Sequence, residues 1–400
     1  MKKQILISVY DMEIGGIERS LINMLESFDY EKYEVDLLIC HHTGDLMNFL
    51  PNMVKILPQI DRYTVFRKPI SQCVKEGHYT LSVVRLLSKS MANLKAKKRN
   101  LEEGAGYIQM QLASKYSTPF IPKLSKKYEV AISYAWPHDL VASKVKANKK
   151  IAWIHTDYSK LEIDNKIDLH VWNQFNHIVS VSDDCKNSFL TQYPILKDKV
   201  ITIENINSPV FIKKMAEEKI HSKEMDANHF NIVSVGRLSY VKGFDLAVKA
   251  LRKLHDKGLT NIKWYVVGFG GYEEELRGII RQSNLTNSFI LLGKKTNPYN
   301  YVQKCDLYVQ PSRYEGKAVT VTEAKILGKP ILITNYPTSK SQVDNGQDGV
   351  ICDLSVEGLA NGIEELYNDT DLRKSLINQI HGVDYSNSHE LKKLYSLIGS

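Results

Sequence analysis

Residues 309–335, VQPSRYEGKAVTVTEAKILGKPILITN, decide the fold. An apolar run ending at Val309 leads into a polar loop, and good helix formers follow from about Lys317. Residues 328–330, Gly-Lys-Pro, end the helix before a second β-branched run at 331–334. This order predicts a strand, a loop, a helix and another strand, the repeating unit of a parallel α/β sheet.

Two glutamates lie in this stretch, Glu315 in the predicted loop and Glu323 in the predicted helix. If the helix were continuous between them, eight residues at about 1.5 Å each would separate the carboxylates by about 12 Å, with about 80° of rotation. They are therefore too far apart to act as an acid/base pair. They can instead hold the two ends of one elongated ligand whose anionic middle faces the amides at the helix start.

Length and composition indicate a soluble, globular protein of two or three domains, at roughly 150 residues each. The 400 residues are 43% hydrophobic and 24% charged. No apolar run approaches the roughly 18 residues of a membrane span, and Asp11 interrupts the first run too early for a secretory signal. The five cysteines are odd in number and form no CxxC pair. We expect reduced, mostly buried thiols in a cytosolic protein, with neither disulfides nor a zinc site.

The positive charge is concentrated in one quarter of the chain. Residues 51–150 hold nineteen Lys and Arg against six Asp and Glu, whereas residues 201–400 hold twenty-five against twenty-three. Such a field favours phospholipid headgroups, lipid diphosphates or nucleic acid, and no nucleic-acid recognition motif accompanies it. We expect residues 51–150 to contact an anionic membrane surface; the alternative is a solvated lysine-rich face. Residues 83–99 predict an amphipathic basic helix that either touches the membrane or packs inside its domain.

Short apolar runs alternate with helical patterns in both halves of the chain, which predicts parallel sheets. A strand, the pair Gly15 and Gly16, and a helix over 17–28 open the first βαβ unit. In the first half we expect strands at 4–9, 35–40, 54–57, 130–134, 151–154, 178–181 and 200–203. In the second half we expect strands at 231–235, 263–267, 289–292, 306–309, 331–334 and 350–352.

This pattern predicts an α/β protein with two doubly wound, Rossmann-like domains that face each other across a cleft, where the strand ends bind ligands. We expect a first domain over residues 1–205, a polar linker over 206–229 and a second domain over 230–375. Residues 376–400 would form a helical segment that packs back on the first domain.

A pair of cations follows the first strand of the second half. In GRLSYVKG, residues 236–243, Gly236 lets the backbone turn. Arg237 and Lys242 can then both reach a diphosphate lying against the loop. Two basic residues in a loop are common. Here, however, they lie in a predicted strand–loop–helix unit that precedes the two-glutamate stretch by about seventy residues.

The stretch VVGFGGYEEEL, residues 266–276, is similar to a dinucleotide fingerprint but departs from it. Gly268 and Gly270 fit the pattern, whereas Glu273 stands where the third glycine is needed. A nicotinamide dehydrogenase is therefore disfavoured. We expect these glycines to let the chain pass close to a nucleotide base or to the sheet.

Five segments carry a resemblance to a known family. They are GGIER at 15–19, IHTDY at 154–158, GRLSYVKG at 236–243, GFGGYEEEL at 268–276 and EGKAVTVTEAKILGKP at 315–330. Together they resemble the retaining glycosyltransferases of family 4, which have the two-domain GT-B fold. The resemblance covers most of the chain and is strongest over 230–355. Residues 328–351 look like those of bacterial capsule and exopolysaccharide enzymes.

The resemblance implies roles for four charged residues of the second half. Arg237 and Lys242 would hold the donor diphosphate and offset the charge on the departing nucleotide, with no metal and no other cofactor. Glu323 would bind the ribose hydroxyls, and Glu315 would face the transferred sugar. A carboxylate accepts from hydroxyls and a guanidinium forks onto phosphate, so each role fits the chemistry of its side chain.

Five further positions receive roles in the same way. The amides of Gly316 and Lys317 would lie near the sugar hydroxyls or the β-phosphate. Gly15 and Gly16 would let the first loop approach donor and acceptor. His155 would hydrogen-bond the sugar or help to organise the acceptor, and its alternative is a hydrogen-bonded core histidine. Lys317 stands where the family commonly has an aromatic or aliphatic residue, which leaves the donor sugar open.

The function implied by the resemblance is that of a hexosyltransferase using a nucleoside-diphosphate sugar, UDP-linked, with retention at the anomeric carbon. The acceptor would be a lipid-linked saccharide in bacterial surface polysaccharide synthesis. The enzyme would be cytoplasmic and peripheral on the inner face of the cell membrane. Two alternatives stay open: a non-catalytic partner subunit of the same fold, and an epimerase or phosphorylase on that architecture.

Overall fold

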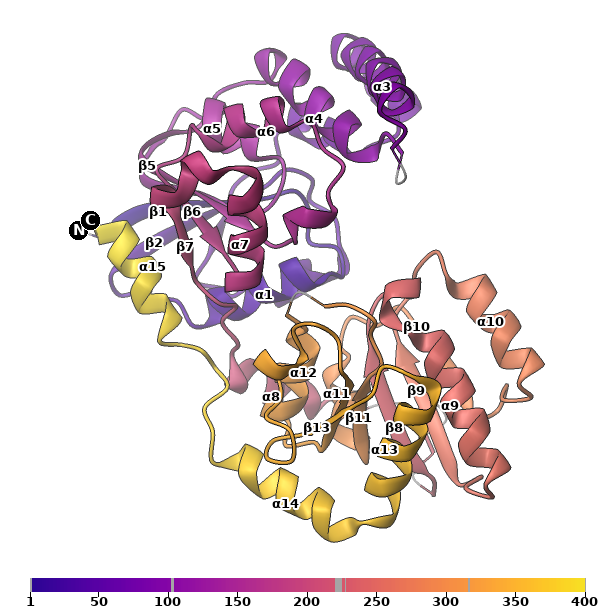
Figure 1. The fold of residues 1–400 in the computed structure, drawn as a ribbon. Helices are drawn as coiled ribbons and strands as arrows, with labels where there is room; N and C mark the ends of the chain where they lie inside the picture. Colours follow the sequence, from indigo (N-terminus) through magenta and orange to yellow (C-terminus); the bar gives the residue numbers. More distant parts are fainter. Residues whose placement is uncertain (1, 102–103, 220–224, 227, 316, 400) are drawn as a thin grey trace. The chain divides into compact units, whose positions relative to one another are not determined.

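The computed structural model describes residues 2–101, 104–219, 225–226, 228–315 and 317–399. The chain divides into two compact units (Figure 1). Unit 1 consists of Met1–Ile206 and Ser388–Ser400, and unit 2 of Asn207–Asn387. Each unit contains one parallel sheet with helices packed on it, so the predicted fold class, two Rossmann-like α/β domains, is confirmed.

Unit 1 is built on a seven-stranded parallel sheet in the order β3-β2-β1-β4-β5-β6-β7. Each strand overlaps the apolar run that predicted it. The strands are β1 (Lys3–Val9), β2 (Tyr33–Ile39), β3 (Lys55–Ile56), β4 (Lys127–Ser133), β5 (Lys146–Ile154), β6 (His177–Ser180) and β7 (Val200–Thr202).

The helices of unit 1 cover this sheet and extend beyond one edge of it, where α3 and α4 lie side by side (Figure 1). The α-helices are α1 (Gly16–Glu26), α2 (Ile70–Lys75), α3 (Tyr79–Arg99), α4 (Gly106–Ser117), α5 (His138–Lys144), α6 (Asn165–Trp172), α7 (Asp183–Gln192) and α15 (Glu390–Gly399). The 3-10 turns are η1 (Asp45–Phe49), η2 (Asp61–Phe66), η3 (Thr118–Phe120), η4 (Tyr158–Lys160) and η5 (Pro194–Lys199).

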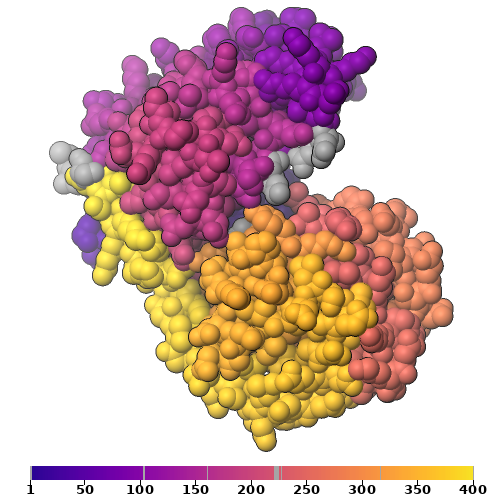
Figure 2. Space-filling view, viewed as in Figure 1, coloured from indigo at the N-terminus to yellow at the C-terminus, as the bar shows by residue number. Residues whose placement is uncertain are grey.

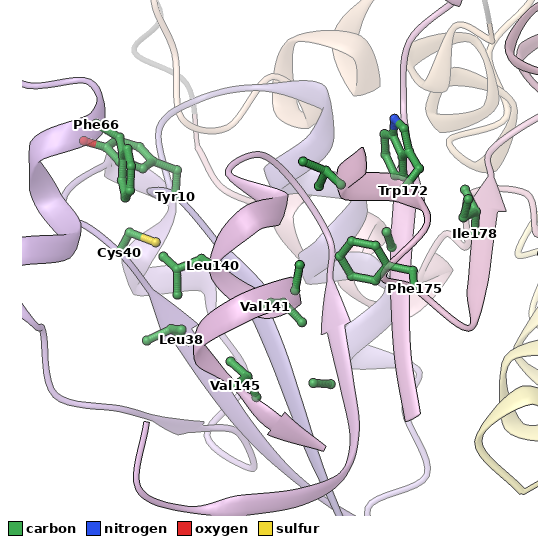
Figure 3. Close-up of a cluster of buried hydrophobic side chains, with 14 of the residues drawn as sticks. Tyr10, Leu38, Cys40, Phe66, Leu140, Val141, Val145, Trp172, Phe175 and Ile178 are labelled. Atoms are coloured by element: carbon green, nitrogen blue, oxygen red, sulfur yellow. The ribbon is translucent and has the colours of Figure 1, made fainter. Parts of the chain in front are cut away.

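The core on one face of this sheet is apolar and rich in aromatic rings (Figure 3). Leu38 of β2 and Cys40, which directly follows that strand, belong to the same buried cluster as Leu140 and Val141 of α5. Trp172 packs edge-on against Phe189, with ring centroids 5.4 Å apart. Close packing of this kind holds the carboxyl ends of the strands, and the loops that follow them, in fixed positions.

The last helix, α15, belongs to unit 1 although unit 2 precedes it in the chain. The Tyr395 ring stacks on Tyr33 at 5.0 Å, and its hydroxyl accepts a hydrogen bond from the backbone amide of Asp29 at 2.8 Å. Lys149 donates to the carbonyl of Leu397 at 2.6 Å. These contacts fix α15 on the edge of the unit where β1 and β2 begin.

Unit 2 is built on a six-stranded parallel sheet in the order β10-β9-β8-β11-β12-β13. All of its strands overlap predicted runs, and β12 and β13 match theirs from end to end. The strands are β8 (Phe230–Val235), β9 (Ile262–Val267), β10 (Phe289–Gly293), β11 (Leu307–Gln310), β12 (Ile331–Thr334) and β13 (Val350–Cys352).

Helices on both faces of the unit 2 sheet bury apolar stripes against it. In α9, for example, the residues at helical spacing from Phe244 to Leu254 are buried, as the sequence pattern predicts. The helices are α8 (Pro209–Ala216), α9 (Phe244–Asp256), α10 (Glu273–Gln282), α11 (Tyr299–Lys304), α12 (Val319–Ile326), α13 (Val356–Asn368) and α14 (Thr370–His381), with 3-10 turns η6 (Tyr240–Lys242) and η7 (Ser339–Ser341).

Two predicted boundaries need correction. The expected linker, 206–229, contains α8, which Ser208 caps and which packs on α11 and α12 of unit 2. Its buried residues Ile212 and Met215 explain why a charged segment is helical, because tertiary burial overrides its polar composition. The expected boundary at residue 376 falls inside α14, which ends at His381.

All five cysteines are buried free thiols, as predicted. Burial raises the pKa of Cys40, Cys305 and Cys352 to about 12 in each case. Among the helices of the described residues, none combines the length and the hydropathy that crossing a bilayer requires.

Candidate functional site

The predicted cation loop and the predicted glutamate loop meet at one place in unit 2. The strand order reverses between β8 and β11, which are adjacent in the sheet. The loop after β8 carries Arg237 and Lys242, and the loop after β11 carries Glu315. Ligands of doubly wound sheets bind at such a reversal, outside the carboxyl ends of the strands. The topology therefore brings together residues about seventy positions apart.

Arg313 joins the two loops. Its guanidinium donates to both carboxylate oxygens of Asp245, at 2.7 Å each, and to the carbonyl of Tyr240 at 2.6 Å. It also lies over the Tyr240 ring, 3.9 Å from the centroid. The hydrogen bonds that Arg313 donates to Asp245 raise the pKa of Arg313. Sequence reasoning missed this clamp, because its partners lie on separate loops and no spacing pattern links them.

The Glu315 carboxylate is almost fully buried and is held through a single oxygen. Oε1 accepts from Lys242 Nζ at 2.5 Å, from Ser312 Oγ at 2.6 Å and from Gln310 Nε2 at 2.9 Å. No described residue donates to Oε2. One oxygen is thus fixed by charge and by two neutral donors, while the other stays available to a ligand hydroxyl.

The main chain around Glu315 is also fixed. Thr334, the last residue of β12, donates its hydroxyl to the carbonyl of Ser312 at 2.5 Å. Thr338 donates to the carbonyl of Glu315 at 2.8 Å. The loop after β11 is therefore tied to the end of the neighbouring strand. Of its donors to the carboxylate, Gln310 and Ser312 were not predicted, although both lie within five residues of Glu315.

Glu323 lies on α12 and is buried, with Tyr299 donating its hydroxyl to Oε1 at 2.9 Å. The helix begins at Val319, later than predicted, because Ala318 adopts an extended conformation as its N-cap. The helix is therefore not continuous from Glu315 to Glu323, and the 12 Å estimate does not apply. No side chain caps α12. In the first turn of α12, the amide of Val321 donates to the carbonyl of Ala318 at 3.0 Å, and the amides of Val319 and Thr320 are left for water or for an anionic ligand.

The remaining predicted residues of unit 2 differ in their surroundings. Arg237 is exposed, and no other described residue forms an ion pair with it. Lys317 is partly buried, and its charge helps to lower the pKa of Lys325, whose burial is the main cause. Gly316 lies outside the described residues. The loop after β8 thus presents the solvated guanidinium of Arg237 and the ammonium of Lys242, which is bound to the Glu315 carboxylate.

The two glycines of the incomplete dinucleotide pattern support the Arg237 loop. A Cβ on Gly268 would lie 1.8 Å from the carbonyl oxygen of Gly236, and one on Gly270 would lie 2.3 Å from that of Leu238. Leu238 and Phe269 are also joined by a backbone hydrogen bond of 3.0 Å. The glycines therefore let the loop after β9 lie directly against the end of β8 and the loop that carries Arg237.

In unit 1, Gly15 and Gly16 open α1 just after β1. Gly15 is the N-cap, and a Cβ there would lie 2.2 Å from Glu18 Oε2; around Gly16 there is open space. Burial raises the pKa of Glu18 to about 7, and the nearby Asp11 adds to this shift. Asp11 itself pairs with Arg67 at 3.3 Å. The first loop therefore carries a carboxyl that is about half protonated near neutral pH.

His155 directly follows β5 and is neutral at neutral pH, because burial lowers its pKa to about 4. Its Nε2 lies 2.8 Å from the carbonyl oxygen of Tyr134, which can only accept, so Nε2 carries the proton. The Tyr134 hydroxyl in turn donates to Ser20 on α1 at 3.0 Å. Nδ1 is left as an acceptor, so this histidine can receive a hydrogen bond from a ligand hydroxyl but cannot supply a positive charge.

Comparison with known proteins agrees with this description of unit 2. Residues 215–382 match the model of the family Glycosyl transferases group 1, which covers most of the unit. The chain is 27% identical over 150 residues to N-acetylgalactosamine-N,N'-diacetylbacillosaminyl-diphospho-undecaprenol 4-alpha-N-acetylgalactosaminyltransferase of Campylobacter jejuni, covering 37% of this chain and 40% of that protein.

A match to a second enzyme covers more of the chain at lower identity. It is the UDP-Gal:alpha-D-GlcNAc-diphosphoundecaprenol alpha-1,3-galactosyltransferase of Escherichia coli, 22% identical over 89% of this chain and 86% of that protein. For three other similar proteins, including the Campylobacter enzyme, the chain spans only 40%, 41% and 55% of their length.

A solved structure shares the fold along the whole chain. Anabaena HepE in complex with UDP-glucose superposes with a TM-score of 0.67 at 17% identity, covering 98% of this chain and all of the other. At this identity the likeness establishes the architecture. The match to Glycosyl transferases group 1 rests on residues 215–382 alone, which lie within unit 2.

Proposed function

We propose that this protein is a glycosyltransferase that moves a hexose-type sugar from a UDP-sugar to a saccharide acceptor. The observation that carries the proposal is the buried pair of Lys242 and Glu315 at the β8–β11 reversal. A cation for phosphate and a carboxylate for hydroxyls meet there within 2.5 Å. A nucleoside-diphosphate sugar offers both groups in adjacent parts of one molecule.

In this proposal the donor lies along the carboxyl edge of the unit 2 sheet. The buried Glu323 accepts from the ribose hydroxyls, and the free Oε2 of Glu315 accepts from a sugar hydroxyl. Arg237 and Lys242 contact the diphosphate, with the first-turn amides of α12 and those of Gly316 and Lys317 nearby. These cations stabilise the negative charge that develops as the nucleotide leaves, without a metal ion.

In the reaction, the bond between the anomeric carbon and the β-phosphate oxygen breaks, and a bond to the acceptor oxygen forms. The proton of the acceptor hydroxyl passes to the departing phosphate, so charge and atoms balance. We propose that the new bond forms on the face that the diphosphate leaves. Both enzymes similar to this chain carry α-linkages in their names, as expected when a usual α-linked donor keeps its configuration.

We also propose that Gly15, Gly16 and His155 of unit 1 contact the donor sugar or the acceptor. The neutral His155 would accept a hydroxyl of the sugar or of the acceptor at Nδ1. Gly15 and Gly16 would leave space beside the start of α1 for the reacting groups. We also propose a lipid-linked acceptor and a peripheral position on the inner membrane face. The two named relatives use diphospho-undecaprenol-linked acceptors, and residues 51–150 are strongly basic.

The first test is nucleotide binding. The melting temperature of the intact protein is measured with UDP, GDP and dTDP, and UDP is expected to stabilise most. A ligand at 100 times its dissociation constant adds about 2.7 kcal/mol to the free energy of unfolding. Glu323→Ala and Lys242→Ala should lose this shift, whereas Lys340→Ala, at an exposed lysine, should keep it. No shift with any nucleotide would refute the proposal.

The second test is turnover. Release of UDP from UDP-glucose, UDP-galactose and their N-acetylated forms is followed with and without an undecaprenyl-diphosphate saccharide. UDP binding without transfer to any acceptor would favour the non-catalytic partner subunit. Conversion of one UDP-sugar into its epimer would favour the epimerase.

A further inference from the structure

Helix α3 is amphipathic in the opposite sense to an ordinary surface helix. The side chains that it buries against unit 1 are mostly small or polar: Leu81, Ser82, Arg85, Ser88 and Ala92. The Arg85 guanidinium donates to the carbonyl of Lys68 and lies 3.5 Å from the Cys73 sulfur. A surface helix normally buries its apolar stripe and exposes its polar face. Here the polar face is the buried one.

The exposed face of α3 is apolar. Six large side chains on it are between 39% and 71% exposed: Tyr79, Val83, Leu86, Leu87, Met91 and Leu94. At about 100° per residue they fall within about 140° of the helix circumference, opposite the buried residues. The sequence left open whether the apolar residues of 83–99 pack inside the domain, and for this exposed stripe they do not. Of the large apolar residues predicted for the helix, only Val84 is partly buried.

The charge along α3 has one sign. Residues 79–99 contain six Lys and Arg and no Asp or Glu. Lys95 and Arg99 lie near Asp164, at 2.6 and 3.9 Å, whereas Lys89, Lys97 and Lys98 are exposed. The apolar stripe thus ends in a cluster of cations at the C-terminal end of the helix. Figure 2 shows this helix, in violet, on the surface of unit 1.

We infer that α3 is a membrane-docking helix that lies in the interface of an anionic lipid bilayer. Its leucine-rich stripe would enter the acyl boundary, while the lysines beside it contact lipid phosphates. A second copy of the chain is the less suitable occupant, because pairing two such stripes would bring two sets of uncompensated lysines together. The helix lies on the bilayer and does not cross it, in accord with its basic composition.

Docking through α3 would bring the site to a lipid-linked acceptor. The identity of that acceptor rests on the proposed function. The binding itself stands on α3 alone. Vesicle binding needs neither donor nor turnover. The protein can therefore bind vesicles without being a transferase, and it can be a transferase without binding vesicles.

The test is co-sedimentation of the full chain with vesicles of phosphatidylglycerol and phosphatidylethanolamine in equal parts, and with vesicles of phosphatidylcholine alone. We expect binding to the anionic vesicles that weakens at high salt, and much weaker binding to the neutral ones. The triple variant Val83→Ser, Leu87→Ser, Leu94→Ser should lower the apparent affinity at least about tenfold. These positions are exposed, so the variant is expected to keep the melting temperature of the wild type.

Matched controls come from the rest of the chain. Ile195→Ser, Val210→Ser, Val383→Ser removes three equally exposed apolar side chains outside α3. Lys89→Gln, Lys97→Gln, Lys98→Gln is compared with Lys146→Gln, Lys197→Gln, Lys340→Gln, which removes the same charge from other exposed positions. Only the α3 variants should lose binding.

Three outcomes would overturn the inference. They are equal binding by wild type and the α3 apolar variant, equal loss in the matched controls, and a wild-type dimer that the α3 variant converts to monomer without any vesicle binding. UDP stabilisation, measured in parallel, should be the same in wild type and in the α3 variants. If it is absent in all of them, the proposed function fails while the docking result stands.

Discussion

Lys242 Nζ lies 2.5 Å from Glu315 Oε1, and this pair joins the loops that follow two adjacent strands of unit 2. The carboxylate is nearly buried, so removing the cation leaves a charge without its partner. We expect Lys242→Met to lower the free energy of unfolding by about 2 kcal/mol without ligand. Adding Glu315→Gln should restore part of this loss. Urea denaturation measures both values.

The matched control for that pair is Lys253→Met. Lys253 contacts Glu357 at 3.0 Å, but these side chains are 39% and 65% exposed, against 23% and 9% for Lys242 and Glu315. We expect a loss below about 0.5 kcal/mol there. Equal losses at Lys242 and Lys253 would show that the buried pair has no special energetic weight.

Ser312 is expected to act as a positioning residue for Glu315. Its hydroxyl donates to Oε1 at 2.6 Å and contacts the carboxylate that would face the sugar. Ser312→Ala should therefore lower kcat/KM for transfer about tenfold and leave the dissociation constant of UDP unchanged. Ser341→Ala, which removes a hydroxyl that donates to the carbonyl of Thr338, is the control. A parallel loss of UDP affinity would contradict this role.

Glu323 should distinguish ribose from its deoxy forms. We expect the wild type to bind UDP at least about tenfold more tightly than 2′,3′-dideoxy-UDP, since the buried carboxylate loses its partners in the second case. In Glu323→Gln this preference should fall, whereas Glu274→Gln, on the exposed face of α10, should keep it. Calorimetric titration gives the two constants. An unchanged preference would place the ribose elsewhere.

The approach of the 268–270 loop to the Arg237 loop can be tested with two alanines. Gly268→Ala would place its Cβ 1.8 Å from a backbone oxygen, whereas the Cβ of Gly271→Ala has open space. We expect the first variant to lose about 2 kcal/mol of unfolding free energy and some UDP affinity, and the second to change neither appreciably. Equal effects would mean that the two loops do not touch in solution.

Glu18 gives a pH dependence of stability. Its folded pKa of about 7 lies above the ordinary value of 4.5. Between these values the folded state binds a proton that the unfolded state has lost, so this group lowers stability as pH rises from about 4.5 to about 7. Glu18→Gln should remove up to about 3 kcal/mol of this loss. Denaturation should show a much larger gain at pH 8 than at pH 5; the same gain at both would refute the shift.

The sequence predicted the strands of both sheets because each is a short β-branched run bounded by Gly, Pro or polar residues. Ile331–Thr334 is such a run, and its bounds match the structure. The order of the loops also predicted that Lys242 and Glu315 serve one ligand, but not that their side chains form an ion pair. The late start of α12 was not predicted, because it depends on Gln342, which accepts from the amide of Ala318.

Contacts between distant side chains were beyond the sequence. Arg313 and Asp245 are 68 residues apart, and nothing in either segment marks them as partners. The helix α8 was missed because its charged composition is typical of a linker, and its burial depends on α11 and α12. The orientation of α3 was open for the same reason. Its sequence shows an apolar face and a polar face, but not which of the two packs on unit 1.

Unit 2 is a single continuous segment inserted into unit 1, which resumes at Ser388. The two crossings are adjacent, because the amide of Asn207 donates to the carbonyl of Ser386 at 2.8 Å. Replacing one stretch of gene, from residue 207 to 387, would therefore exchange the whole of unit 2 at a single pair of neighbouring joints. If unit 2 binds the donor as proposed, we expect such a cassette exchange to alter donor choice, while α3 and the lipid binding proposed for it stay with the host chain.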